Sequence, residues 1–378
     1  MNPTRKSDEP NRREFLAGSM GALLAAKIGG LSAAANASAL INPEITPAQS
    51  AAPHRIIIDT DPGVDDALAI LLALHSPELK VEAITPVAGN VGLEFTLPNA
   101  LRLVEIAGRT DVPVAAGASH PLVRTLFTAS YVHGNNGLGG VDFPAPKIKP
   151  VAETATEIIR RIVRANPGEI SIVAVGPLTN VGTVLRADPA LASMIRSIVI
   201  MGGSLSGGNV TPAAEFNLWV DPEAARIVFD ADVPLTMVGL DVTRKVLFTP
   251  EHLRILESGT TPSSQAAARI MRATIDNLSK LPHPMLEAMH DPLTIAHLID
   301  PGILKLQDYY VEVETAGEFT AGQTLGYPWA PARGSAPMAT AAGKTSTAEL
   351  EYRTNAKVAI GVDPDRFFRL LLSRLMST

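Results

Sequence analysis

The chain has 378 residues, of which 46% are hydrophobic and 19% are charged, and it contains no cysteine. This composition is typical of a folded globular protein, and it excludes a largely disordered chain, disulfide bonds and thiolate metal sites. The formal net charge of −6 argues against binding to nucleic acid, which usually requires clusters of basic residues. Any metal ion must therefore be bound by oxygen or imidazole ligands.

Residues 1–52 are expected to be an export signal peptide and a linker. Arg12 and Arg13 precede an apolar stretch, Phe15 to Ala26, that is too short to span a bilayer. Small residues at Ala35 to Ala39 offer cleavage sites. The arginine pair resembles a twin-arginine signal, which implies a periplasmic or secreted protein that meets the twin-arginine translocase during export. An uncleaved amphipathic anchor is the alternative, but no other apolar run is long enough to predict stable membrane insertion.

Residues 53–378 are expected to form one domain in which strands alternate with helices. The predicted strands are Arg55–Asp59, Val81–Val87, Val112–Ala116, Ile170–Val175, Ser197–Met201 and Leu235–Val238. The predicted helices are a segment that includes Leu68, Leu71 and Leu72, followed by Leu93–Ala107, Thr154–Ala165, Leu178–Arg186 and Pro222–Phe229. This alternation indicates an α/β fold with a mostly parallel central sheet flanked by helices. Ligands of such sheets bind at the carboxyl ends of the strands.

The last third of the chain has a different pattern. After Thr249 it is mainly helical up to a predicted strand pair, Tyr309–Glu314 and Lys357–Gly361. Between these strands, residues 326–347 are rich in Gly, Ala, Pro and Thr, which predicts a flexible insertion. Asp363–Met376 is expected to be a closing helix.

An acidic loop directly follows the first predicted strand and reads Asp59-Thr60-Asp61-Pro62-Gly63-Val64-Asp65-Asp66. Four carboxylates in eight residues repel one another strongly unless they are paired. A hard divalent cation suits them, because it prefers several oxygen ligands. The alternative is a capped helix beside a solvated loop, but the preceding strand and the Pro-Gly turn favour a metal site. Calcium suits the site better than zinc, and magnesium also fits the chemistry.

Three further motifs carry polar side chains. Gly207–Asn217 is a glycine-rich turn that contains Asn, Glu and Asn side chains suited to binding a polyol. His290 stands beside a carboxylate in Met289-His290-Asp291-Pro292-Leu293, and His133 begins the glycine-rich segment His133–Gly140, which suggests a mobile lid. Taken singly, these residues would more often be turn or cap residues.

Together and in this order, the motifs resemble the inosine–uridine-preferring nucleoside hydrolase family, whose signature DTDPGxDD matches Asp59–Asp66. The resemblance covers residues 54–375. It implies a Rossmann-like nucleoside hydrolase fold and an N-glycosyl hydrolase that uses Ca²⁺ to convert ribonucleosides of the inosine and uridine type to ribose and free base. It also implies a homodimer or homotetramer. A pyrimidine-preferring enzyme is an open alternative, because both histidines are present.

The resemblance also implies a role for each residue of the site. Asp61 would activate a metal-bound water and His290 would protonate the leaving base. The implied metal ligands are Asp61, Asp66, the carbonyl of Val175 and Asp291. The implied substrate contacts are Asp65, Asn90, His133, Met201, Asn209, Glu215, Asn217 and Asp291. Asn136 departs from the family pattern, which often has an acidic residue there. The helix Ser264–Lys280 lacks the aromatic residue that would contact the base.

Two alternative functions are weighed against this interpretation. Haloacid-dehalogenase-type phosphatases also place Asp-x-Asp after a strand, but Gly63 stands where they carry Thr or Val, and they lack the Asp65-Asp66 pair. A non-catalytic exported nucleoside-binding protein is the second alternative. It is disfavoured because every expected metal and base position keeps a competent side chain.

Overall fold

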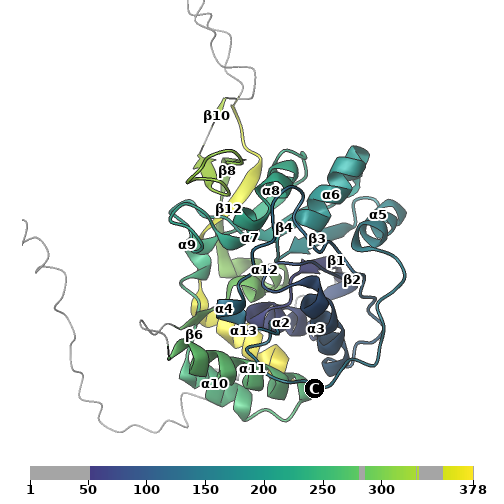
Figure 1. Ribbon diagram of the computed structural model, residues 1–378, viewed down its shortest axis with the longest axis vertical. Coiled ribbons are helices and arrows are strands. Elements are labelled where there is room, and N and C mark those ends of the chain that lie inside the picture. Colours follow the sequence, from purple (N-terminus) through teal and green to yellow (C-terminus); the bar gives the residue numbers. More distant parts are fainter. Residues whose placement is uncertain (1–51, 281–285, 329, 332–351, 378) are drawn as a thin grey trace, which may run out of the picture. The chain divides into compact units, whose positions relative to one another are not determined.

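The computed structural model describes residues 52–280, 286–328, 330–331 and 352–377 (Figure 1). The expected export signal and most of the predicted insertion at 326–347 lie outside these residues. Among the helices of the described ranges, none is both long and apolar enough to cross a membrane.

An eight-stranded sheet with the order β2-β1-β3-β4-β5-β12-β8-β9 forms the centre of the described domain. Its strands are β1 (His54–Thr60), β2 (Leu79–Pro86), β3 (Ile170–Ala174), β4 (Ser197–Met201), β5 (Leu235–Val238), β8 (Leu304–Val313), β9 (Thr324–Tyr327) and β12 (Ala356–Val362). The pairs from β2 through to β12 are parallel, whereas β8 runs antiparallel to both of its neighbours. The predicted α/β fold with a mostly parallel sheet is confirmed.

Helices cover both faces of this sheet (Figure 1). One face carries α2 (Val64–Leu74), α3 (Leu93–Ile106), α10 (Pro250–Glu257), α11 (Pro262–Leu278), α12 (His290–Ile299) and α13 (Pro364–Met376). The other face carries α5 (Ala155–Ala165), α6 (Thr179–Ala187) and α8 (Pro222–Phe229). The strands serve both layers because successive side chains alternate between faces: Ile56 and Ile58 join the first cluster and Ile57 the second.

The remaining helices and strands of the described residues are short. They are α4 (Ser130–His133), α7 (Phe216–Val220), α9 (Leu240–Thr243), β6 (Leu247–Phe248), β7 (Glu287–Ala288), β10 (Ala330–Pro331), β11 (Tyr352–Arg353) and the 3-10 helices Pro189–Met194 and Pro301–Ile303. Strands β6 and β7 form a separate antiparallel pair. Through β7 this pair leads into the start of α12.

Most of the predicted elements are confirmed, and one strand is wrong. The segment 112–116 makes only an isolated bridge between Val114 and Ile84 at the edge of the sheet. Pro113 has no N–H group to donate, and the carbonyl of Val114 accepts from Val151 instead of from a strand. The predicted strand pair near the C-terminus is confirmed as β8 and β12, which the structure shows to be antiparallel, and β8 begins earlier than expected, at Leu304.

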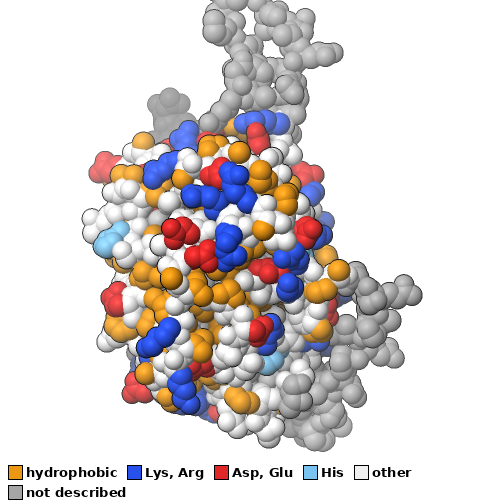
Figure 2. Space-filling view, turned by 90° about the vertical axis from the view of Figure 1, so that its right-hand side faces the viewer, with side chains coloured by type: hydrophobic (Ala, Val, Ile, Leu, Met, Phe, Trp, Pro, Cys, Tyr) orange, Lys and Arg blue, Asp and Glu red, His pale blue; other side chains and the backbone are white. Residues whose placement is uncertain are grey.

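Charges of both signs are spread over the surface. On the face shown in Figure 2, Lys and Arg side chains are interspersed with Asp and Glu side chains. Many charged side chains of the protein surface form ion pairs, such as Arg109 with Asp111 at 2.9 Å and Arg161 with Glu153 at 2.7 Å. The negative charges of these surface carboxylates are therefore neutralised by arginine side chains of the protein itself.

Candidate active site

A cavity of 480 Å³ lies where β3 and β4 end, within the size range of about 300–1,000 Å³ that small-molecule sites occupy. Its wall includes the predicted site residues Asp65, Asn90, His133, Val175, Met201, Asn209, Glu215, Asn217, His290 and Asp291. Asp61 and Asp66 are fully buried and lie outside this wall. The fold thus brings together segments that are more than two hundred residues apart in the sequence, such as Asp65 and Asp291.

The acidic loop folds into the turn between β1 and α2. Asp66 stabilises the start of α2 because its Oδ2 accepts a hydrogen bond from the backbone N–H of Gly63 at 2.9 Å, while its Oδ1 accepts from Thr60 Oγ1 at 2.5 Å. A Cβ atom on Gly63 would lie 2.5 Å from His133 Nδ1 and 2.6 Å from Asn90 Nδ2. Glycine is therefore required here for close approach of these two side chains.

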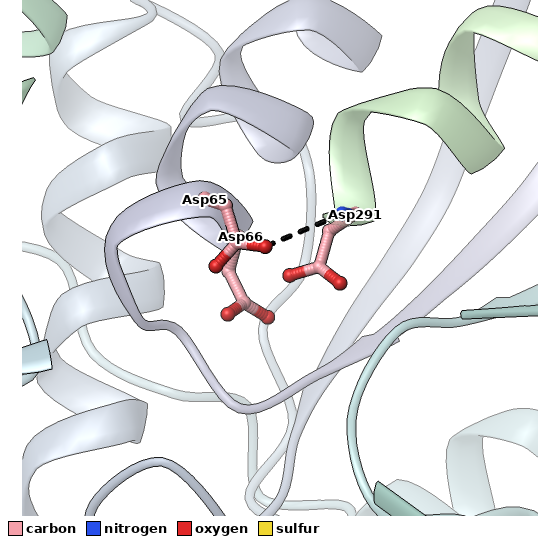
Figure 3. Close-up of side chains that lie close together, drawn as sticks. All are labelled: Asp65, Asp66 and Asp291. Atoms are coloured by element: carbon pink, nitrogen blue, oxygen red, sulfur yellow. Dashed lines mark hydrogen bonds between the residues drawn. The ribbon is translucent and has the colours of Figure 1, made fainter. Parts of the chain in front are cut away.

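Asp65, Asp66 and Asp291 form a group of buried carboxylates, and one oxygen atom from each lies within 4.8 Å of the other two. Figure 3 shows that they project from the first turns of α2 and α12 toward a common space. The two helices are tied at this point, because the backbone N–H of Asp291 donates to Asp65 Oδ2 at 3.3 Å. Asp65, expected from the sequence as a substrate contact, thus belongs to the carboxylate group, and Asp61 lies outside it.

Asp61 is fully buried, and only one of its two carboxylate oxygens accepts a hydrogen bond within the described part of the chain. Its Oδ2 accepts from the backbone N–H of Asn90 at 2.7 Å. Its Oδ1 is buried and has no hydrogen-bond partner among the described residues. A Cβ atom on Gly176 would lie 2.5 Å from this oxygen, so the backbone after β3 approaches the carboxylate closely.

In the absence of a cation, burial and mutual repulsion shift the carboxylates of the site toward their protonated forms. Burial, followed by the charge of Asp66, raises the pKa of Asp61 well above its ordinary value and that of Asp65 to about 7. Burial and then Asp65 raise the pKa of Asp291 in the same way. Among the ion pairs of the described residues, none supplies a Lys or Arg to these groups. A buried oxygen without a partner beside clustered carboxylates fits a hard divalent cation.

The residues expected to bind ribose also join the loop after β4 to the sheet. Glu215 accepts at the start of α7 from the N–H groups of Asn217 and Leu218, at 2.9 and 3.2 Å. Asn217 Nδ2 donates to the carbonyls of Val175 and Met201, at 2.9 and 3.1 Å. The ends of β3 and β4 are therefore held against the cavity by one amide side chain.

Two further amides hold the loops of the cavity. Asn209 Oδ1 accepts from the N–H of Phe216 at 2.9 Å. Asn90 Nδ2 donates to Asp66 Oδ2 at 3.0 Å and to the carbonyl of Asp61 at 3.2 Å. Both residues keep their predicted place in the cavity wall, and both have a structural role in addition.

The two predicted histidines are buried and held in fixed orientations. The backbone N–H of Val64 donates to His133 Nδ1 at 3.1 Å, so the neutral ring carries its proton on Nε2. His290 Nδ1 lies 2.7 Å from Thr243 Oγ1. Burial lowers the pKa of His133 to about 3 and that of His290 to about 4, with Arg244 adding to the effect on His290. Both rings are therefore neutral at pH 7 in the free protein.

Asn136, which departs from the family pattern, organises its own loop. Its Oδ1 accepts from the N–H groups of Leu138 and Gly140, both at 3.0 Å. Gly134 and Gly140 adopt positive φ angles of 74° and 81°, which residues with a side chain rarely adopt. An uncharged amide thus closes the turn that follows His133.

Sequence analysis missed several residues of the cavity wall. They include Tyr131, Arg244, Leu247, Leu278, Leu286 and Glu287. The available signal for Glu287 was an acidic residue in an otherwise apolar segment, three positions before His290. Thr243, the partner of His290, had no comparable signal, because it comes from the distant helix α9.

Comparison with known proteins gives matches to one family of enzymes. Residues 56–369 match the family described as inosine-uridine preferring nucleoside hydrolase. The chain is 44% identical over 271 residues to the pyrimidine-specific ribonucleoside hydrolase RihA of Citrobacter koseri, covering 71% of this chain and 87% of the relative. It is 41% identical over 321 residues to RihA of Escherichia coli, covering 85% of this chain and 97% of the relative.

Solved structures of nucleoside hydrolases resemble this chain in fold and in sequence. A plant nucleoside hydrolase has a TM-score of 0.76 and 34% identity, over 86% of this chain and all of that one (100%). A purine-preferring ribonucleoside hydrolase from Gardnerella vaginalis has a TM-score of 0.75 and 32% identity, over 85% and 98% of the two chains.

Proposed function

Because the chain belongs to the inosine-uridine preferring nucleoside hydrolase family, it hydrolyses the N-glycosidic bond of ribonucleosides, and we propose that it prefers pyrimidine ribonucleosides. The preference is supported by two relatives of 41% and 44% identity that are named pyrimidine-specific. Chromatography of the bases released from uridine, cytidine, inosine and adenosine tests it. We expect uracil and cytosine to be released fastest, and faster release of hypoxanthine or adenine would contradict the preference.

The cation of this site is proposed to be calcium. Asp61, Asp66, Asp291 and the carbonyl of Val175 would hold it, and Asp65 is close enough to share the charge. The free oxygen of Asp61 and the oxygen-only donor set support calcium over softer metals. When bound, such an ion lowers the pKa of a nearby water and positions the ribose hydroxyl groups.

Asp61 is proposed as the general base that accepts a proton from the water attacking C1′. Its position supports this role, since Oδ2 is fixed by the N–H of Asn90 and Oδ1 is left free. The Asn90 side chain also donates a hydrogen bond to the backbone carbonyl of Asp61. The carboxylate is therefore oriented before substrate arrives, which favours proton transfer.

The remaining residues of the cavity wall are proposed to bind the two parts of the nucleoside, the ribose and the base. Asp65, Asn90, Met201, Asn209, Glu215 and Asn217 would bind the ribose. His133 and His290 would face the base. Because the His290 ring is neutral in the free protein, it would take up a proton in the substrate complex and then donate it to the departing ring. The contact with Thr243 supports this role, because it holds Nδ1 and leaves Nε2 for the substrate.

The N-terminal 52 residues are proposed to direct export through the twin-arginine pathway. Arg12, Arg13 and the apolar stretch that follows them support this proposal. Replacing both arginines by lysine should retain the protein in the cytoplasmic fraction of a bacterial host. Unchanged recovery in the periplasmic or culture fraction would contradict it.

A further inference from the structure

Glu287 is a buried acidic residue of the cavity to which the reaction described above gives no role. It lies in β7, three residues before His290, and its exposed fraction is only 6%. It nevertheless belongs to the cavity wall. A carboxyl group in such a place loses its hydration, so a polar partner is needed to compensate.

The protein supplies no such partner from the described residues. Two other carboxylates of the cavity wall accept hydrogen bonds from the chain: Asp65 accepts from Asp291, and Glu215 accepts from Gly203 and Asn217. The backbone of Glu287 pairs with that of Phe248 in the β6–β7 ladder, but no hydrogen bond or ion pair joins its side chain to any residue in the described ranges. Arg244, the cation in the same wall, donates to the carbonyl of Gly208.

Glu287 also lies outside the carboxylate group of the metal site. That group consists of Asp65, Asp66 and Asp291. Burial, followed by the charge of Asp65, raises the pKa of Glu287 to about 8. Glu287 is thus near enough to sense the metal site electrostatically but does not take part in it. In either protonation state its carboxyl group keeps an oxygen that can accept a hydrogen bond.

The surroundings of Glu287 are suited to the flat apolar faces of a nucleobase. Leu247, Leu278, Leu286 and Ala288 line the same cavity. The polyol-binding candidates Asn209 and Asn217 come instead from the loop and helix that follow β4. A nucleobase in apolar surroundings needs a polar contact at its edge to be distinguished from similar bases.

We propose that Glu287 is a specificity-determining residue that accepts a hydrogen bond from an N–H group on the edge of the bound nucleobase. This inference rests on the proposed function and identifies the chemistry of its substrate. The donor is either the 4-amino group of cytosine or the ring N3–H of uracil. Bases that lack an N–H at this edge would leave the Glu287 carboxyl unpaired and react slowly.

Matched substrates test this contact within each protein. Cytidine is compared with the riboside of pyrimidin-2-one, which lacks only the amino group, and uridine is compared with 3-methyluridine, which lacks the N–H. We expect the calcium-loaded protein to prefer the donor-bearing member of at least one pair by roughly 10- to 100-fold in kcat/KM. The pair that shows the preference identifies the donor.

Three variants separate recognition from other roles. Glu287→Ala should reduce the preference to about 3-fold or less, while Glu287→Gln should retain most of it, because its carbonyl oxygen still accepts. Glu318→Ala, at an exposed position outside the cavity, is the matched control and should behave as the parent protein. Thermal unfolding of each variant checks that it is folded.

Two readouts exclude structural or metal-binding explanations. Turnover of p-nitrophenyl riboside, which has no base edge, should stay within about 3-fold in Glu287→Ala, since the lost contact is to the base. Calcium affinity, measured by titration calorimetry, should also be unchanged. An unaltered substrate preference in Glu287→Ala, or a parallel loss of calcium affinity, would overturn the inference.

The same experiment distinguishes failure of the inference from failure of the proposed function. If the parent protein releases purine bases fastest, the pyrimidine preference is wrong. The inference is then judged on the substrate ratios within each pair, which do not depend on that preference. A parent protein that shows no preference in either pair overturns the inference even when pyrimidines are its best substrates.

Discussion

The acidic residues of this protein occupy two contrasting environments. At the surface, Asp111 pairs with Arg109, and the hydrogen bond from that guanidinium lowers the pKa of Asp111. In the cavity, burial raises the pKa of Asp61 and Asp291 well above the ordinary value, and no arginine or lysine of the described ion pairs reaches them. The surface charges are thus compensated by the protein itself.

The difference shows where an external partner is required. An exposed pair such as Arg109 with Asp111 contributes little to stability, because water and salt screen it. Buried carboxylates without a cation are costly, so they are kept where a bound ion or substrate compensates them. Replacing a cavity carboxylate should therefore lower activity, whereas replacing a surface carboxylate should change stability only slightly.

The largest effect is expected at Asp61. Asp61→Ala should lower kcat/KM by at least roughly 1,000-fold for every substrate, because it removes both the proposed base and a proposed metal ligand. Initial rates with uridine and with p-nitrophenyl riboside measure this loss. Asp111→Ala is the control with near-normal rates, and an Asp61→Ala protein of comparable activity would remove Asp61 from the reaction.

A smaller and selective effect is expected at His290. His290→Ala should slow uridine and inosine by roughly 100-fold, in the range of general acid catalysis, and should spare p-nitrophenyl riboside, whose leaving group needs less protonation. Rates with all three substrates provide the comparison. Equal losses on the nucleosides and on p-nitrophenyl riboside are incompatible with a leaving-group acid.

The stability of the metal-free protein should depend on pH through the cavity. Folding raises the pKa of Asp65 to about 7 and that of Glu287 to about 8, so the folded state binds more protons than the unfolded state between about pH 4 and pH 8. The contribution of these groups to stability is therefore greatest below this window and is lost as the pH rises through it.

Calcium should oppose this loss, because it binds the ionised carboxylates. Thermal unfolding with chelator and with calcium, at pH 5.5 and pH 8, measures the effect. We expect calcium to raise the unfolding temperature more at pH 8. An equal rise at both values would show that the cavity carboxylates are not the groups that calcium stabilises.

The smallest effect is expected at the surface. Asp111→Ala should change the free energy of unfolding by no more than about 1 kcal/mol, as is usual for an exposed ion pair. Urea unfolding measures this change. A much larger loss would mean that the contrast between surface and cavity carboxylates does not hold.

Local sequence patterns were sufficient to predict most of the fold, whereas the residues assigned to the cavity wall came from the family resemblance and covered only part of it. The apolar runs of β1 and β3 and the loop Asp59–Asp66 carry strong short-range signals, and the order of the motifs placed them at one edge of the sheet. The segment 112–116 has the apolar composition of a strand, but Pro113 has no N–H group to donate to a neighbouring strand. The carbonyl of Val114 accepts from Val151, a partner that is set by tertiary contacts.

The fine arrangement of the site was not predictable in the same way. The grouping of Asp65 with Asp66 and Asp291 is set by how closely α2 packs on α12. The place of Glu287 in the wall depends on the pairing of β7 with β6. The spacing of residues along the chain encodes neither the packing of α2 on α12 nor the pairing of β6 with β7, because each joins segments that are far apart in sequence.

The most direct test of the central claim is base release from uridine and cytidine by metal-stripped protein before and after calcium is restored, followed by chromatography. The cavity predicts that stripped protein is essentially inactive and that calcium restores release of base and ribose in equal amounts. Full activity of the stripped protein, verified free of metal by elemental analysis, would contradict the assignment of the buried carboxylates to a metal site.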